Sequence, residues 1–179
     1  DEDTIVVLCG DTPLIEKETL EKLFAYHLEN EYMATVLTTK VEDPTGYGRV
    51  IRDSEGNFEK IVEQKDANEE ELAVNEINSG IYCFKGDKLK EALDLLDNNN
   101  AQGEYYLTDT MKIIKDKGSK VGVFVGATIE ELMGVNSRVQ LAQAEAIMRK
   151  RINKKHMDNG VTIINPENTY IEANVQIGK

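Results

Sequence analysis

The 179-residue chain is 40% hydrophobic and has a formal net charge of −12, without the basic cluster that a nucleic-acid backbone requires. This length suffices for one substantial core with an appendage, and no apolar run approaches the roughly 18 residues of a membrane span. Nothing at the start resembles a signal peptide. We therefore expect a cytoplasmic protein that binds neither nucleic acid nor membrane.

Residues 4–39 show the pattern of a strand, a helix and a second strand. Residues 4–9 form a short apolar run closed by Gly10, which is typical of a strand buried on both faces of a parallel sheet. Residues 16–30 have apolar side chains at helical spacing, and residues 33–39 again favour a strand. This order predicts a βαβ unit and with it an α/β fold.

The pattern changes in the middle of the chain. Residues 49–52 and 58–63 are short strand-like runs separated by turn-forming residues, which predicts a hairpin and an antiparallel piece in the sheet. A mixed sheet follows from this prediction. Two further strands and two further helices are predicted over 77–84, 120–125, 88–96 and 108–117.

The C-terminal part has a different composition. Ser137 begins a capping-box pattern, and the stretch to His156 lacks Gly and Pro, which predicts one long helix. Twenty residues would extend about 30 Å, a length that suits an arm leading away from a core. Within residues 161–179, Ile171 and Ile177 have the spacing of a hexapeptide β-helix, although such folds need about three repeats and barely one is present.

Asp11 directly follows the first predicted strand. A carboxylate in this position projects into the crevice at the carboxyl end of a parallel sheet, where such sheets bind ligands. Mg²⁺ is held by one or two carboxylates together with substrate phosphates, so a single Asp can serve phosphate chemistry. The alternative is that Asp11 only caps the turn before Pro13, and spacing alone does not separate the two.

Small or amide residues recur at three strand ends or turns. Gly lets a ligand approach the backbone, and Asn offers a donor and an acceptor to sugar hydroxyls or amides, but singly each motif is better explained by turn chemistry. Glu63, at a strand end, either accepts a hydrogen bond from a sugar hydroxyl or pairs with Lys65 at the surface. The three motifs are Gly46-Tyr47-Gly48, Asn78-Ser79-Gly80 and Gly134-Val135-Asn136.

Taken together, the motifs resemble one family. Residues 8–15, which contain Gly10-Asp11-Thr12-Pro13, are similar to that family's metal-binding strand end, and residues 43–50 resemble its sugar-contacting loop. The matching strings that follow in the same order are 61–67, 76–81, 98–109 and 134–138. Over nearly its whole length the chain resembles the bacterial bifunctional N-acetylglucosamine-1-phosphate uridyltransferase and glucosamine-1-phosphate acetyltransferase.

This resemblance implies an α/β fold in three parts. The first is a truncated nucleotidyltransferase domain with a Rossmann-like mixed sheet, expected over residues 1–136. The second is a long helical arm over residues 137–157. The third, residues 158–179, is the first turn of a left-handed β-helix. The full-length family protein is a homotrimer assembled through that β-helix.

The implied reaction joins UTP and N-acetylglucosamine 1-phosphate into UDP-N-acetylglucosamine, a precursor of the bacterial cell wall and lipopolysaccharide, and expels pyrophosphate. The resemblance implies Mg²⁺ as cofactor, with Asp11 and Asn136 as its ligands, and no catalytic side chain within these residues. The implied contacts to the UDP-sugar are Gly48, Glu63, Asn78 and Asn136.

Two parts of the implied enzyme have no match in the sequence. They are the Gly-rich loop and uracil-reading segments that hold the nucleotide, and the acetyltransferase β-helix beyond its start. The chain opens at Asp1 without Met, so we expect the natural start to lie upstream, the fragment to be inactive alone, and residues 4–8 to expose an unpaired edge. Two alternatives are a nucleotidyltransferase for another hexose 1-phosphate, and a non-catalytic fragment that binds sugar nucleotides.

Overall fold

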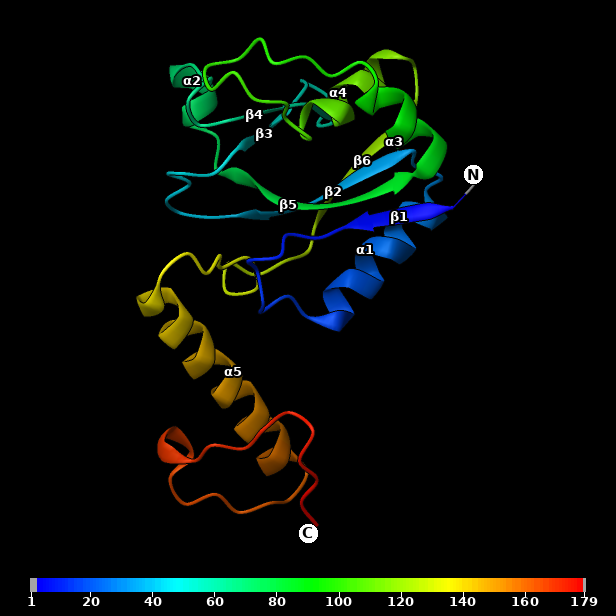
Figure 1. The fold of residues 1–179 in the computed structure, drawn as a ribbon. Coiled ribbons are helices and arrows are strands. Elements are labelled where there is room, and N and C mark those ends of the chain that lie inside the picture. The colour runs from blue at the N-terminus through cyan, green and yellow to red at the C-terminus, as the bar shows by residue number, and fades with distance from the viewer. Residues whose placement is uncertain (1–2, 179) are drawn as a thin grey trace. The chain divides into compact units, whose positions relative to one another are not determined.

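The computed structural model describes residues 3–178, and its described chain falls into two compact units. Unit 1 takes the residues up to Gly10 together with Ile15–Leu132, and unit 2 takes Asp11–Leu14 and the chain from Met133 onward. In chain order the elements are β1 (Thr4–Val7), α1 (Lys17–Glu29), β2 (Ala34–Lys40), β3 (Arg49–Arg52), β4 (Phe58–Val62), α2 (Glu69–Leu72), β5 (Glu76–Lys85), α3 (Gly86–Leu93), α4 (Asp109–Asp116), β6 (Val121–Val125), α5 (Arg138–Asp158) and the 3-10 helix η1 (Pro166–Asn168) (Figure 1).

Strand β5 organises the sheet of unit 1. It pairs antiparallel with β2 on one side, and on the other side with β3 near its start and with β1 near its end. The sheet order is β4-β3-β5-β2-β6, with β1 attached to β5, and β2 and β6 are parallel. The predicted mixed sheet and the β3–β4 hairpin are therefore confirmed.

The prediction that the first strand is buried on both faces of a parallel sheet was wrong. β1 is antiparallel to its neighbour β5, and Ile5 and Val6 are each 40% exposed. Because β1 and β2 are both antiparallel to β5, they run in the same direction, with β5 inserted between them. The apolar run correctly indicates a strand, but an apolar sequence does not report whether a neighbour covers each face.

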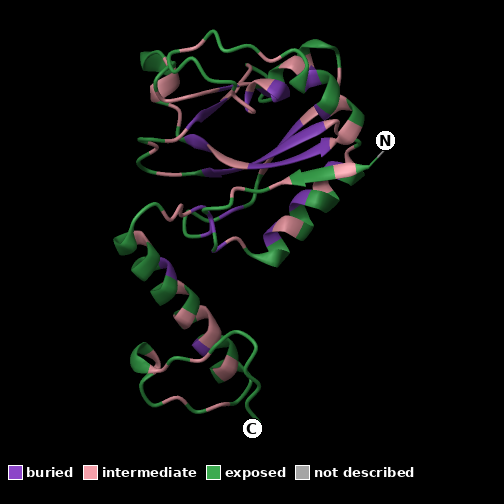
Figure 2. Ribbon diagram, viewed as in Figure 1, coloured by how far each residue is buried: buried purple, intermediate pink, exposed green. Residues whose placement is uncertain are grey.

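Two layers of helices cover the sheet. Successive residues of a strand point to opposite faces, and Val36 and Leu37 accordingly belong to two separate core clusters. Leu37 packs with Leu23 of α1, whereas Val36 shares its cluster with Met111 of α4. The helices α1 and α4 lie on opposite faces of the sheet (Figure 1). Figure 2 shows the buried residues concentrated on the central strands.

The predicted helices 16–30, 88–96, 108–117 and 137–156 correspond to α1, α3, α4 and α5. The short helix α2 was not predicted. Its N-terminus carries a capping box in which Asn68 and Glu71 satisfy each other's backbone N–H groups. Four residues with no buried side chain give no apolar periodicity from which a helix could be predicted.

In unit 2, α5 holds the C-terminal segment. Ser137 caps the helix by accepting a hydrogen bond from the Gln140 N–H. Near the other end, the buried amide of Asn153 donates to the carbonyls of Pro166 and Thr169. Up to residue 178 this segment contains no strand, and a single coil has no neighbouring coil to pair with. Within residues 3–178 no helix is both long and apolar enough to cross a membrane.

Candidate functional site

The register of three neighbouring strands brings Gly48, Glu63 and Asn78 together. Arg49 lies opposite Val62 of β4 and opposite Ile77 of β5. Because β3 is antiparallel to both β4 and β5, Gly48, the position before Arg49, is opposite the residues that follow Val62 and Ile77. The Asn78 N–H accordingly donates to the Gly48 carbonyl at 2.9 Å. These three residues are called the hairpin cluster.

Glu63 lies against Gly48. A β-carbon built on Gly48 would come within 3.1 Å of Glu63 Oε1 and 3.3 Å of Oε2, so the carboxylate occupies the space that a side chain would otherwise use. The Lys65 Nζ donates to Gln102 Oε1 at 2.7 Å, so the observed partner of Lys65 differs from the Glu63 pair considered from the sequence. Burial, followed by the charges of Asp66 and Asp109, raises the pKa of Glu63.

Asn78 braces an irregularity in β5. Its Oδ1 accepts from the Gly80 N–H at 3.0 Å and from the Tyr82 hydroxyl at 2.9 Å. The Gly80 backbone has a φ of 76°, a conformation that favours glycine, opposite a register shift in β2. An N–H can only donate, so the atom that faces Gly80 must be the amide oxygen. The NH₂ group of Asn78 is then the part that can serve a ligand.

Asp11 and Asn136 meet within unit 2. The Val135 N–H donates to the Asp11 carbonyl at 2.8 Å, which places the two segments side by side. A β-carbon on Gly134 would lie 3.4 Å from Asp11 Oδ2 and 3.5 Å from Asn136 Nδ2, so both side chains reach the space over this glycine. The Asn136 N–H is held by Gln140 Oε1 at 2.8 Å. The start of α5 therefore fixes the Asn136 backbone.

No group of three or more His, Cys, Asp or Glu side chains in the described part of the chain is placed to hold a metal ion. Asp11 and Asn136 instead form a pair of one carboxylate and one amide. Such a pair offers hard oxygen donors but needs further ligands to complete a coordination shell.

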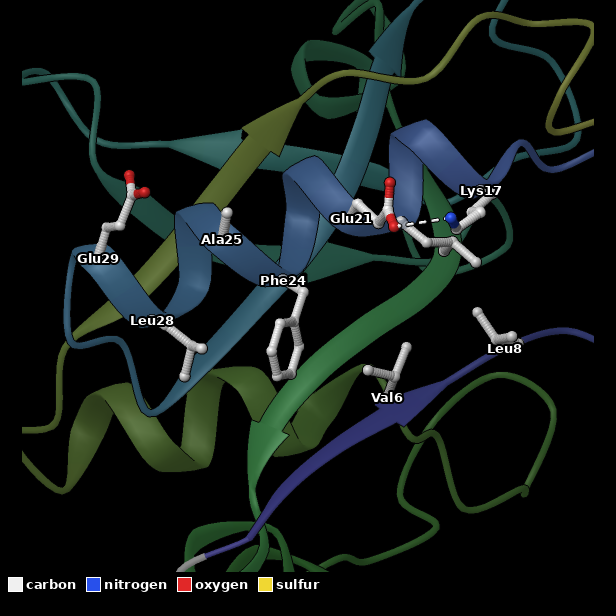
Figure 3. A pocket seen from close by; sticks show the side chains of 9 residues that line it. Val6, Leu8, Lys17, Glu21, Phe24, Ala25, Leu28 and Glu29 are labelled. Carbon is white, nitrogen blue, oxygen red and sulfur yellow. Dashed lines mark ion pairs between the residues drawn. The ribbon is translucent and has the colours of Figure 1, made fainter.

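An apolar groove of about 650 Å³ lies beside β1, between this strand and α1 (Figure 3). Val6 of β1 and Leu8, just after this strand, line it on one side, and Phe24 and Leu28 of α1 line it on the other. These four side chains are between 39% and 49% exposed. Its polar rim includes the ion pair Lys17–Glu21, with Nζ and Oε1 3.2 Å apart (Figure 3). Among residues 3–178, β1 pairs with β5 alone, and a strand edge without a partner beside apolar side chains is a surface that favours association.

Three residues around the hairpin cluster were not predicted from the sequence as functional. Gln64 Oε1 accepts from the Gly46 N–H at 3.0 Å, and Tyr82 donates to Asn78. Cys9 donates from its thiol to the Gly80 carbonyl, with Sγ and O 3.4 Å apart. Gln64 lies in a matching string, but its partner is 18 positions away, so spacing could not reveal the contact.

The family model described as nucleotidyl transferase matches residues 1–129 of the chain. Among curated relatives, the bifunctional protein GlmU of Clostridioides difficile (strain 630) is 72% identical over 178 residues, which is 99% of this chain and 39% of that protein. The bifunctional protein GlmU of Alkaliphilus oremlandii (strain OhILAs) is 61% identical over 178 residues and is covered to the same 39%. The chain thus spans about two fifths of the length of these relatives.

Among solved structures, a UDP-glucose pyrophosphorylase complexed with UDP-glucose matches with a TM-score of 0.58 and 18% sequence identity. The match covers 80% of this chain and 57% of that one. At this identity the likeness concerns the fold. It agrees with the mixed sheet of unit 1.

Proposed function

We propose that this chain, which belongs to the nucleotidyl transferase family, supplies the sugar-phosphate side of an enzyme that forms UDP-N-acetylglucosamine and pyrophosphate from UTP and N-acetylglucosamine 1-phosphate. The observation that carries the proposal is the hairpin cluster, where the Glu63 carboxylate lies against Gly48 and the Asn78 backbone N–H donates to the Gly48 carbonyl. The identity of 72% and 61% with bifunctional GlmU proteins supports the choice of substrate.

Each member of the hairpin cluster has a distinct part in this proposal. Glu63 accepts hydrogen bonds from sugar hydroxyls, and the NH₂ group of Asn78 donates to a hydroxyl or to the N-acetyl carbonyl. Gly48 contacts the sugar through its backbone, and its missing side chain leaves the space in which the Glu63 carboxylate lies. Together they offer an acceptor and a donor on a rigid sheet, which is how positioning lowers the barrier of a reaction between two bound substrates.

Asp11 and Asn136 fit a magnesium site. Both can present oxygen to the space over Gly134, because a half-turn of the Asn136 amide exchanges its two terminal atoms. Phosphate oxygens of the substrates would supply the further ligands that this pair lacks. Magnesium chemistry at such a site neutralises charge that develops on the reacting phosphates. Asn136 also contacts the UDP-sugar in this proposal, and no protein nucleophile takes part.

The remaining parts of the proposal concern the longer protein. We assign residues 137–157 to an arm and residues 158–179 to the start of a left-handed β-helix, because they follow the nucleotidyltransferase part of the chain in that order. That β-helix carries the acetylation of glucosamine 1-phosphate and assembles a homotrimer. The protein acts in the cytoplasm and serves synthesis of cell-wall and lipopolysaccharide precursors. The match to bifunctional GlmU proteins up to the end of the chain supports this assignment.

Calorimetric titration of the chain with UDP-N-acetylglucosamine tests the proposal. We expect binding with Mg²⁺ present, weaker binding of UDP-glucose, and a further loss in Glu63→Gln, which keeps the shape of Glu63 but removes its charge. Equal affinity for the two sugar nucleotides would favour an enzyme for another hexose 1-phosphate. Failure of the folded wild-type chain to bind either nucleotide would contradict the assigned sugar site.

A further inference from the structure

The turn that follows β4 connects the hairpin cluster to two separate loops. The Asp66 N–H donates to the Glu63 carbonyl at 3.0 Å, which closes a tight turn directly at the cluster. Within it, Gln64 holds Gly46, two residues before Gly48. Every link described here lies within unit 1. The turn 63–66 therefore governs where the Glu63 carboxylate lies.

Asp66 fastens a distant segment, residues 98–106, to this turn. Its Oδ1 accepts from the Ala101 N–H at 2.7 Å, and its Oδ2 accepts from the Tyr106 hydroxyl at 3.2 Å. The side chain of Gln102 donates to the same hydroxyl at 2.9 Å and accepts from Lys65. Lys65 and Asp66, adjacent in the turn, thus bind three residues of segment 98–106: Ala101, Gln102 and Tyr106.

Segment 98–106 has a defined shape of its own. Asn100 Oδ1 accepts from the Gln102 N–H at 3.1 Å and from the Glu104 N–H at 3.2 Å, and the Asn98 amide donates to the Gly103 carbonyl at 3.4 Å. These bonds brace the loop from inside. Asp66 therefore binds a loop that already has its shape. Through these hydrogen bonds the loop helps to fix the position of the turn 63–66.

We propose that Asp66 is a positioning residue that holds segment 98–106 against the turn 63–66 and so keeps the Glu63 carboxylate in place over Gly48 for sugar binding. This inference rests on the proposed function of the hairpin cluster. After burial, the negative charge of Asp66 is a further cause of the raised pKa of Glu63. The sequence marks residues 98–109 as a family string but gives them no role, and fastening the sugar site is that role.

The test compares three single variants by their affinity for UDP-N-acetylglucosamine. Asp66→Ala removes both acceptors, and we expect about fivefold weaker binding, the size of one to two hydrogen bonds. Asp66→Asn should bind within about twofold of wild type, because its oxygen can still accept from Ala101 and its NH₂ can donate to the Tyr106 hydroxyl. The matched control is Asp97→Ala, which removes an exposed carboxylate that accepts from the Asn99 N–H in the same region, and it should leave affinity unchanged.

A double-mutant cycle separates positioning from general support of the fold. If Asp66 acts through Glu63, Asp66→Ala should cause no further loss of affinity in the Glu63→Gln background. Hydrogen exchange at the Ala101 amide should rise in Asp66→Ala, which shows that the segment is released. Should Asp66→Ala fail to fold, Tyr106→Phe removes one of the two bonds and should weaken binding about twofold.

Three results would overturn the inference. One is an Asp66→Ala chain with a released segment and unchanged affinity. Another is that Asp66→Ala weakens binding as much in the Glu63→Gln background as in the wild-type chain. The third is that Asp97→Ala weakens binding as much as Asp66→Ala does. A wild-type chain that does not bind sugar nucleotide would overturn the proposed function as well, whereas binding that depends on Glu63 and not on Asp66 would overturn this inference alone.

Discussion

Around β3, β4 and β5 the loops are tied by hydrogen bonds, whereas beside β1 and α1 the apolar side chains face an open groove. The hairpin cluster lies on the first side, with Glu63 against Gly48. On the second side, Val6 and Leu8 line the groove. The strand β1 pairs with β5 along one of its two edges. One part of the sheet thus carries the braced polar groups that the proposed sugar site requires, and the other carries an exposed apolar groove.

The largest expected effect tests whether the hydrogen-bonded side suffices for catalysis. We expect no measurable pyrophosphate release by this chain with UTP, N-acetylglucosamine 1-phosphate and Mg²⁺, because the sequence lacks a Gly-rich loop to cradle the triphosphate. Losing one preorganised donor slows a reaction by about 10² to 10³, and several donors would be absent together. Mixing the chain with a separate N-terminal segment of the enzyme should restore turnover. Robust turnover by the chain alone would show that the chemistry lies elsewhere.

The next effect concerns Asp11, which follows β1 in the chain. In a full-length enzyme that contains this chain, we expect Asp11→Asn to lower uridyltransfer about 10²-fold at fixed Mg²⁺, because the variant removes the carboxylate from the proposed metal pair. The acetyltransferase rate of the same preparation is the control, since the substitution changes no β-helix residue. Wild-type uridyltransfer in the variant would contradict the assignment.

The sequence predicted more about elements than about contacts between them. The strands β3, β4 and β5 were identified, but the register that puts Gly48 between Glu63 and Asn78 depends on pairing across 15 to 30 positions. Apolar residues 4–9 predicted a strand, yet its exposure depends on neighbours that composition does not report. Asp66 was not singled out because its partners lie 35 and 40 positions away. The roles of the proposed site residues stay predictions.

A buried histidine of α1, which contacts Thr35 of β2, should make stability depend on pH. Burial, followed by the charge of Lys85, lowers the pKa of His27 to about 4, and its Nδ1 lies 2.9 Å from Thr35 Oγ1. Because the unfolded histidine has the higher pKa, the unfolded state binds more protons and stability falls as the pH drops below about 6.5. Between pH 7.5 and 5 we expect a loss of about 2 kcal/mol in the free energy of unfolding.

Urea unfolding at several pH values measures this loss, and His27→Gln is the control. Glu63 and Asp109 have raised pKa values, so their protonation stabilises the folded state at low pH and opposes the trend. The difference between wild type and His27→Gln removes these shared contributions. A difference that does not change with pH would show that His27 does not titrate as a buried neutral group.

The smallest expected effect tests whether the groove beside β1 is the surface through which the chain associates. Val6 and Ile5 are neighbours in β1 and are each 40% exposed, but Val6 lines the groove and its neighbour points to the opposite face of the sheet. A lysine at position 6 would bring an unpaired charge into any apolar contact made there, whereas a lysine at position 5 would not. We therefore expect Val6→Lys to weaken self-association about tenfold in sedimentation experiments, and Ile5→Lys to behave as wild type. Both variants keep the backbone groups of the β1 edge, so a difference between them isolates the groove from strand pairing. Equal weakening by both would assign the association to the strand edge itself, and no weakening by either would move it away from β1.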